Sequence, residues 1–181
     1  MAHDPQLIVF AGMPGTGKSS LARAVARELR AVYLDKDTVK DCTLALAERM
    51  KLDQGPQLAG PLSYELLVDL ARDNLSLGLP VVLDSPAGYQ VFRDRVKGLA
   101  RAAKVELRLI ECICTDERLV RQRLESRSQD LPAYRARDWN TYQRDMTQFE
   151  RLTERRLVVD TAESLALNLR KVLGYLARSQ D

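Results

Sequence analysis

Short apolar runs alternate along the chain with longer stretches in which apolar residues recur every three or four positions. Leu7–Ala11 is continuously apolar, and Lys18–Arg30 follows with the spacing of a helix. Further strands are predicted at residues 31–34, 80–84, 105–114 and 157–160. Strands that alternate with helices form parallel sheets through right-handed crossovers. The pattern therefore predicts an α/β fold with three layers, in which helices cover both faces of a five-stranded parallel sheet.

The remaining segments are predicted to be helices joined by polar turns. After the first helix, helices are expected at about 38–50, 64–77, 89–103, 115–127, 141–154 and 165–176. Thr115 and Asp116 have the residue types that cap a helix. The segment DQGPQLAGP at 53–61 contains two glycines and two prolines, and it predicts a loop between two helices. Without a repeat or a linker, residues 1–181 are predicted to form a single domain.

Composition limits the classes of protein. Hydrophobic residues make up 45% of the chain and charged residues 29%, which is typical of a globular protein. Three cysteines and one histidine argue against a disulfide framework and a zinc site. The apolar runs are shorter than the ~18 residues of a membrane span, and the first one is unlike a secretory signal. We therefore expect a cytoplasmic protein.

The first strand leads into the sequence GMPGTGKSS at residues 12–20, which matches the pattern G-x-x-x-x-G-K-[ST]. Glycines allow successive backbone amides to point at phosphate oxygens, and the following helix adds its N-terminal amides. Lys18 would reach the terminal phosphates and the Ser19 hydroxyl would help to hold Mg²⁺. No N-K-x-D base-reading motif is present, so ATP is favoured over GTP. The predicted nucleotide-binding residues are Gly12, Met13, Pro14, Gly15, Thr16, Gly17, Lys18, Ser19 and Ser20.

The stretch GMPGTGKSSLARAVARELRAVYLDKD resembles the opening of the small P-loop kinases and AAA-type ATPases. That group includes polynucleotide 5′-hydroxyl kinases, chloramphenicol phosphotransferase-like proteins and zeta-toxin-like kinases. The similarity extends through VVLDS, CTDERLVRQRLESR and VVDTAES. It implies the strand order 2-3-1-4-5 and a lid at about residues 128–140, before the fifth strand.

The second predicted strand ends in LDKDTVKD, which carries the candidate acceptor side of the site. The carboxyl edge of a parallel sheet borders the ligand crevice. The resemblance implies that Asp37 takes a proton from the acceptor hydroxyl and that Lys40 binds the acceptor. Relatives often have Arg at the position of Lys40, and a lysine lacks the bidentate fork. An alternative is that Asp37 caps the next helix, with Asp35 as the base.

Asp84 ends the third predicted strand. We expect it to hold Mg²⁺ together with Ser19 or to orient Lys40, with a purely structural role in the loop as the alternative.

Arginines between Arg118 and Arg156 give this segment a local charge of +4, against +3 for the whole chain. Arg123 and Arg127 lie four positions apart and therefore share a helical face. The resemblance implies that they stabilise phosphate charge, with Arg135 and Arg137 in the lid. It also places Thr161 beside the adenine, although the segment 160–162 would serve equally as a helix N-cap.

These features predict an ATP- and Mg²⁺-dependent phosphotransferase with Lys18, Asp37, Arg123 and Arg127 as its catalytic residues. The acceptor would be a small-molecule or nucleotide-like hydroxyl compound bound by the segments 36–50, 54–64 and 85–92. Two alternatives are a nucleotide-dependent switch without an acceptor and a nucleic-acid 5′-hydroxyl kinase. Nucleic acid is not favoured, because a net charge of +3 does not provide a broad backbone-binding face.

Overall fold

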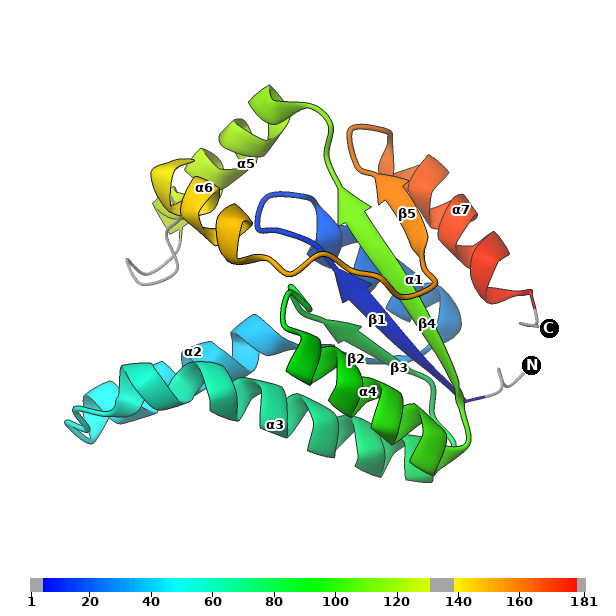
Figure 1. The fold of residues 1–181 in the computed structure, drawn as a ribbon, viewed down its shortest axis with the longest axis horizontal. Coiled ribbons are helices and arrows are strands. Elements are labelled where there is room, and N and C mark those ends of the chain that lie inside the picture. Colours follow the sequence, from blue (N-terminus) through cyan, green and yellow to red (C-terminus); the bar gives the residue numbers. More distant parts are fainter. Residues whose placement is uncertain (1–4, 131–138, 179–181) are drawn as a thin grey trace.

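The computed structural model describes residues 5–130 and 139–178 and has the predicted sheet (Figure 1). Within these residues, the sheet has five parallel strands in the order β2-β3-β1-β4-β5. The strands are β1 (Gln6–Ala11), β2 (Val32–Asp35), β3 (Val81–Asp84), β4 (Glu106–Ile113) and β5 (Leu157–Asp160). The predictions of α/β class and strand order are therefore confirmed.

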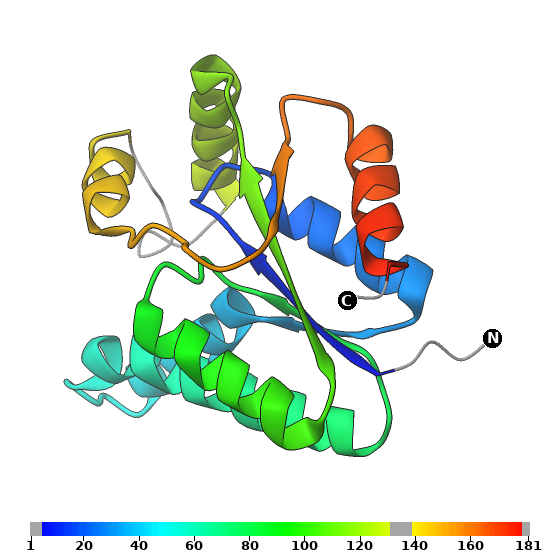
Figure 2. The ribbon, with the colours of Figure 1, turned by 45° about the vertical axis from the view of Figure 1, so that its right-hand side comes forward.

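The sheet is buried because β1 is apolar on both of its faces. Leu7 and Val9 belong to the core cluster beneath α3 (Gly55–Ser76) and α4 (Gln90–Ala103). Ile8 and Phe10 belong to the opposite cluster, together with residues of α1 (Lys18–Leu29) and α7 (Leu165–Leu176). Figure 2 shows these two helical layers on either side of the sheet. Alternate side chains of a strand face opposite ways, so the continuous apolar run supplies both cores.

Three further helices lie towards the carboxyl edge of the sheet. They are α2 (Lys36–Arg49), α5 (Glu117–Asp130) and α6 (Trp139–Gln148). The Asp116 carboxylate accepts hydrogen bonds from the backbone amides of Arg118 and Leu119. The prediction that Asp116 caps a helix is therefore confirmed. The predicted lid extends from the end of α5 into α6, and its central part lies outside the described residues.

The predicted loop at 53–61 is wrong, because α3 already begins at Gly55. Pro56 lies in the first turn, where the missing amide hydrogen has no helical partner to lose. A Cβ on Gly55 would lie 2.2 Å from Cβ of Ala47, so the glycine allows α3 to start directly against α2. Pro61 lies inside the helix and removes only the amide donor to Gln57. The residues that were interpreted as helix breakers thus begin a helix.

The predicted helix 141–154 is too long, because α6 ends at Gln148. Residues 149–156 instead cross in front of the sheet and lead to β5 (Figure 1). Glu150 and Glu154 of this segment contact Gln90 and Arg93 in the first half of α4. The Glu150 amide donates to the Gly88 carbonyl at 3.0 Å, and so the segment finds its backbone partner outside a helix.

Among the residues that the structure describes, no helix is both long enough and apolar enough to cross a membrane.

Candidate active site

The loop between β1 and α1 has a backbone that only glycines suit. Gly12 has φ 140°, and a Cβ there would lie 2.3 Å from the carbonyl oxygen of Cys112 on β4. Gly17 has φ 71° and forms the N-cap of α1. The motif therefore fixes a tight passage from strand to helix, which we call the P-loop (residues 12–20).

The N-terminus of α1 has the properties of an anion site. No described side chain caps this helix, so its first amides keep their hydrogens directed out of its end. The Thr16 hydroxyl donates to the Met13 carbonyl at 2.8 Å and stiffens the loop. Unpaired amides and the helix dipole together favour phosphate oxygens.

The P-loop borders a cavity of about 550 Å³, the P-loop cavity. Lys18, Arg123, Thr161 and Asp37 face it from four different elements or loops. Its remaining lining residues are Gly12, Met13, Pro14, Gly15, Gly17, Ser19, Ser20, Leu21, Pro86, Leu119, Gln122, Ser126, Glu163, Leu165 and Asn168. Every predicted P-loop residue except Thr16, which is buried beneath the loop, lines this cavity. The cavity has the size of a small-ligand site.

Asp84 is only 1% exposed and has a partner on each carboxylate oxygen. The Lys18 ammonium donates to Oδ1, and the Tyr33 hydroxyl donates to Oδ2 at 2.6 Å. Burial and then the Asp84 charge raise the pKa of Tyr33 above its ordinary value, so the phenol keeps its proton and remains a donor. The predicted contact of Asp84 with Lys40 is replaced by this pair with Lys18.

The same network continues to the start of α2. Arg23 Nε donates to the Tyr33 hydroxyl at 3.3 Å, and its guanidinium lies 3.7 Å from Asp35 Oδ2. Asp35 is the N-cap of α2, and its side chain accepts from the amide of Asp37 at 3.0 Å. The alternative that Asp37 caps this helix is therefore wrong. Asp37 lies in the first turn, where its carboxylate is 49% exposed and is 3.5 Å from Lys36 Nζ.

Arg123 joins the P-loop to the segment after β5. Its guanidinium donates to Thr161 Oγ1 at 3.0 Å, to the Thr161 carbonyl at 2.9 Å and to the Gly15 carbonyl at 3.3 Å. The Thr161 hydroxyl donates in turn to the Thr16 carbonyl at 2.6 Å. The planar guanidinium group of Arg123 donates to three acceptors at once, and the single ammonium group of a lysine could not reproduce these contacts.

The other predicted arginines fall partly outside the described part of the structure. Arg127 belongs to α5, but its side chain is not among those described. Arg135 and Arg137 lie outside the described residues altogether. Arg121, which is offset from the predicted pair, binds Glu117 and lies 3.8 Å above the ring of Trp139.

A second cavity of about 610 Å³ adjoins the first, and we call it the aromatic cavity. It shares Met13, Pro14, Asp37 and Pro86 with the P-loop cavity. The three segments expected to bind an acceptor all contribute to it: Lys36, Asp37, Lys40 and Asp41 from the first, Gly60, Pro61 and Tyr64 from the second, and Pro86, Gly88, Tyr89, Val91 and Phe92 from the third. The rest of its lining consists of Met13, Pro14, Glu65, Arg95, Leu124, Asp145, Gln148, Phe149 and Glu150.

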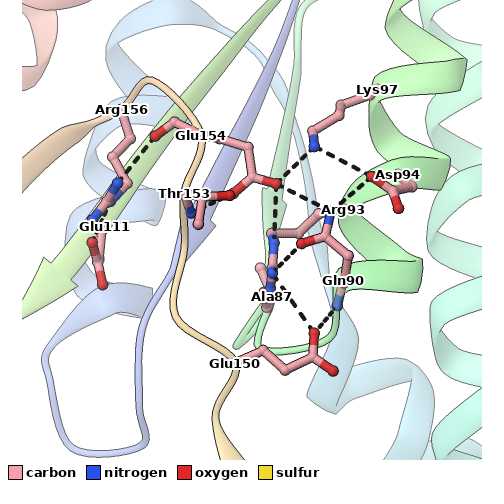
Figure 3. Close-up of polar contacts among 10 residues, drawn as sticks. All are labelled: Ala87, Gln90, Arg93, Asp94, Lys97, Glu111, Glu150, Thr153, Glu154 and Arg156. Atoms are coloured by element: carbon pink, nitrogen blue, oxygen red, sulfur yellow. Dashed lines mark hydrogen bonds and ion pairs between the residues drawn. The ribbon is translucent and has the colours of Figure 1, made fainter.

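Asp145, Gln148, Phe149 and Glu150 form one wall of the aromatic cavity, which we call the 145–150 wall. Arg93, which is 5% exposed, attaches this wall to α4 (Figure 3). Arg93 donates to the Ala87 carbonyl at 2.9 Å and to Glu154 Oε1 at 3.2 Å. Its guanidinium also lies 3.7 Å from Glu150, whose carboxylate accepts from the Gln90 amide. A buried arginine with this many partners holds the segment 149–154 against the start of α4.

Sequence reasoning did not identify Tyr33, Arg93 or Phe149 as part of the site. Tyr33 and Arg93 lie inside a strand and a helix, where single residues give no pattern. Phe149 belonged to a segment that was predicted to be helical, and a Cβ on Gly88 would lie 2.7 Å from its ring. These contacts depend on the packing of segments 51 to 61 residues apart, which spacing along the chain does not reveal.

The residues of the P-loop cavity could hold Mg²⁺ only together with phosphate oxygens of a bound nucleotide. Within the described residues, no group of three or more His, Cys, Asp or Glu side chains could hold a metal. Ser19 lines the P-loop cavity beside Lys18. Mg²⁺ commonly binds through few protein oxygens, with phosphates and waters as its other ligands, so this donor set suits it.

The model of the AAA domain family matches residues 7–152 of this chain. No curated protein sequence matches it. Among solved structures, a protein assigned as a kinase from Chloroflexus aurantiacus j-10-fl has a TM-score of 0.74 and 22% identity, covering 97% of this chain and 98% of that one.

Two further kinases have similar structures. A gluconokinase from Sinorhizobium meliloti 1021 has a TM-score of 0.68 at 21% identity, over 97% of this chain and 94% of that chain. Mycobacterium tuberculosis APS kinase CysC, in complex with AMPPNP and APS, has a TM-score of 0.67 at 19% identity, over 97% and 99%. Similarity at these identities establishes a shared P-loop NTPase fold.

Proposed function

Since this chain belongs to the AAA domain family and has the P-loop NTPase fold, we propose that it is an ATP- and Mg²⁺-dependent phosphotransferase. It transfers the γ-phosphoryl group to a hydroxyl of a small-molecule or nucleotide-like acceptor. The kinases of similar structure, one of them with AMPPNP bound, support this reaction class.

The position of Asp37 carries the proposal. This residue lines both cavities, one formed around the P-loop and the other around α2, α3, α4 and the segment 145–150. Its carboxylate is half exposed, and its own amide is fixed by Asp35. A base must lie within reach of the proton that it removes, and the junction of two substrate cavities provides that place.

The chain's own residues account for the step. The acceptor oxygen attacks the γ-phosphorus, and its proton passes to the carboxylate of Asp37. The bond from the γ-phosphorus to the bridging oxygen breaks, and ADP leaves with that electron pair. Lys18 and the amides of the P-loop stabilise the charge on the phosphate oxygens.

Ser19, which lines the P-loop cavity, is the residue that would hold Mg²⁺, and the buried Asp84 carboxylate is paired with Lys18 of the same loop. When bound, Mg²⁺ would supply additional positive charge to the phosphates. Asp84 keeps Lys18 at the mouth of the P-loop through their ion pair, so the ammonium is already in place when a nucleotide binds.

A phosphotransfer screen with labelled ATP tests the proposal. The panel should contain sugars and sugar acids such as gluconate, APS, nucleosides, aromatic alcohols and 5′-hydroxyl oligonucleotides. Transfer should require Lys18, and Arg72→Ala, an exposed charge on α3, should serve as the unaffected control. Hydrolysis of ATP without any labelled acceptor would favour the nucleotide switch, and labelling of oligonucleotides alone would favour the nucleic-acid kinase. Failure to bind ATP with Mg²⁺ would refute the proposal.

A further inference from the structure

A row of leucines is exposed along one side of α3. Leu58, Leu62, Leu66 and Leu70 are each between 38% and 56% exposed. They follow one another at intervals of four residues and therefore share one helical face. Isolated leucines are common on protein surfaces, whereas a contiguous apolar row marks a place of contact with another molecule.

The end of α2 enlarges this row (Figure 1). Ala47 of α2 lies against Gly55 at the start of α3, and Leu46 and Met50 on either side of Ala47 in the sequence are exposed. Leu52, in the connection between the two helices, is exposed as well. The α2–α3 face, as we call it, consists of Leu46, Met50, Leu52, Leu58, Leu62, Leu66 and Leu70. None of these seven side chains lines the P-loop cavity or the aromatic cavity, so the face is separate from the candidate active site.

Exposed charges of both signs surround the α2–α3 face. At the α2 end they are Glu48, Arg49, Lys51 and Asp53, and along the second half of α3 they are Asp69, Arg72 and Asp73. Nucleic acids and anionic membranes bind proteins through an excess of lysine and arginine. Three cations among four carboxylates do not provide that excess, whereas a surface of mixed sign can face a copy of itself without net repulsion.

We propose that the α2–α3 face binds the same face of a second copy of this chain and forms a dimer with twofold symmetry. Such an interface pairs one surface patch with itself. With the two α3 helices antiparallel, the twofold axis passes between Leu62 and Leu66. Leu58 of each copy then lies opposite Leu70 of the other, so the rows cover each other along their whole length.

The charges favour this antiparallel arrangement over a parallel one. Asp69 and Asp73 flank the C-terminal half of the leucine row. In a parallel pair, these carboxylates would face their own copies across the axis, and like charges repel. In the antiparallel pair, they face the α2 end of the other copy, which carries Arg49 and Lys51.

The face is large enough for a specific dimer. α3 has 22 residues, which corresponds to a length of about 33 Å. With α2 beside it and helices about 10 Å across, each copy offers roughly 600 Å². Two copies would bury on the order of 1,200 Å², the lower end of the range for specific interfaces. We therefore expect a dissociation constant on the order of micromolar.

Sedimentation of the full chain from about 1 μM to about 200 μM tests the proposal, since this range brackets a micromolar constant. The wild type should pass from monomer to dimer. Leu62→Glu should remain a monomer throughout, because dimerisation would bury a charge. Circular dichroism should show that this surface variant is folded. A wild type that stays monomeric would overturn the proposal.

Val158→Glu is the matched control. Val158 is 46% exposed and lies on β5, the edge strand of the sheet. This variant should dimerise like the wild type. If Val158→Glu abolished the dimer and Leu62→Glu did not, the interface would be the sheet edge and the proposal would be wrong.

A charge exchange tests the antiparallel arrangement. Asp73→Lys should weaken dimerisation about tenfold, because the change acts twice in a symmetric dimer. Adding Arg49→Glu and Lys51→Glu to the same chain should restore most of the affinity. An affinity that falls further in the combined variant would overturn the arrangement.

A membrane is the other occupant to be tested. Co-sedimentation with vesicles of phosphatidylcholine and phosphatidylglycerol should leave the protein in solution. Binding to the vesicles that is lost in Leu62→Glu would assign the face to a lipid surface and overturn the proposal.

Discussion

The hydroxyl of Tyr33 donates a hydrogen bond of 2.6 Å to Asp84 Oδ2, while Lys18 donates to the other oxygen of the same carboxylate. β2 and β3 are parallel neighbours, and Asp35 pairs with Asp84 in their register. Tyr33 therefore reaches across the end of the sheet and fixes the carboxylate that holds the P-loop lysine. Through Arg23 and Asp35 the same network reaches the first turn of α2, where Asp37 lies.

Removing the Tyr33 hydroxyl should disturb the lysine without touching a substrate. Tyr33→Phe leaves Asp84 Oδ2 buried without its donor, which lowers the free energy of unfolding by about 1–3 kcal/mol. We expect kcat to fall about tenfold, with a smaller change in the KM for ATP. Urea unfolding and phosphotransfer assays measure the two effects. Tyr175→Phe on α7 is the matched control, and an equal loss of activity in that variant would contradict the role of Tyr33.

Lys18→Ala should reduce phosphotransfer by at least about a thousandfold, because in the proposed reaction the Lys18 charge stabilises the terminal phosphates. The change also leaves Asp84 buried without a counter-ion, so the variant should unfold at lower denaturant concentration. Lys18→Ala combined with Asp84→Asn should recover stability but not activity. Recovery of both would mean that Lys18 acts only on the fold.

Asp35 and Asp37 make a matched pair for locating the base. Asp37→Asn should lower kcat by roughly 10²–10⁴ with little effect on thermal stability. Asp35→Ala should destabilise the protein by about 0.5–2 kcal/mol through loss of the α2 cap, and should keep most of the activity at a temperature where it is folded. Steady-state rates and melting temperatures of both variants check this assignment. The reverse pattern would make Asp35 the base.

The geometry of Arg123 predicts that a lysine cannot replace it. Arg123→Lys keeps the charge but cannot contact both Thr161 and Gly15, so the P-loop and the segment after β5 should separate. We expect the KM for ATP to rise about tenfold. Arg121→Lys, on the same helix but paired with Glu117 at the surface, should leave it unchanged. Equal KM values in both variants would indicate that Arg123 contributes only its charge.

The fold was predictable because its signals are local. A continuous apolar run such as LIVFA indicates a strand that is buried on both faces. The P-loop motif identifies a tight connection from a strand to a helix, because its glycines are needed only in such a connection. The strand order came from the family resemblance and is confirmed. Gly55 and Pro56 misled the prediction because the same residues that break a helix also start one.

The candidate site was predictable where one segment forms it and not where several segments meet. Eight of the residues that line the P-loop cavity lie within the predicted stretch 12–20. The sequence did not reveal which lysine pairs with Asp84. Lys18 and Lys40 are both possible partners as long as the relative positions of β2, β3 and α1 are unknown. The segment 149–154 is the clearest case, since its partners on α4 lie about sixty residues earlier.

The ion pairs of that segment predict how stability depends on pH. Burial alone would raise the pKa of Glu154, but the hydrogen bond from Lys97, its own backbone and the charge of Arg93 lower it to about 2, below its usual 4.5. A carboxyl whose pKa is lower in the folded state stabilises that state above pH 4.5, and the stabilisation disappears as the pH falls towards 2.

Glu154→Gln should therefore unfold more readily than the wild type at neutral pH, by about 2 kcal/mol, and the two proteins should converge in acid. Chemical unfolding between pH 7 and pH 2.5 measures both curves. Glu125→Gln, an exposed position on α5, should follow the wild type throughout. Parallel curves for Glu154→Gln and the wild type would contradict the low pKa. In that case Arg93 would hold the wall of the aromatic cavity through Ala87, Gln90 and Glu150 without help from the Glu154 charge.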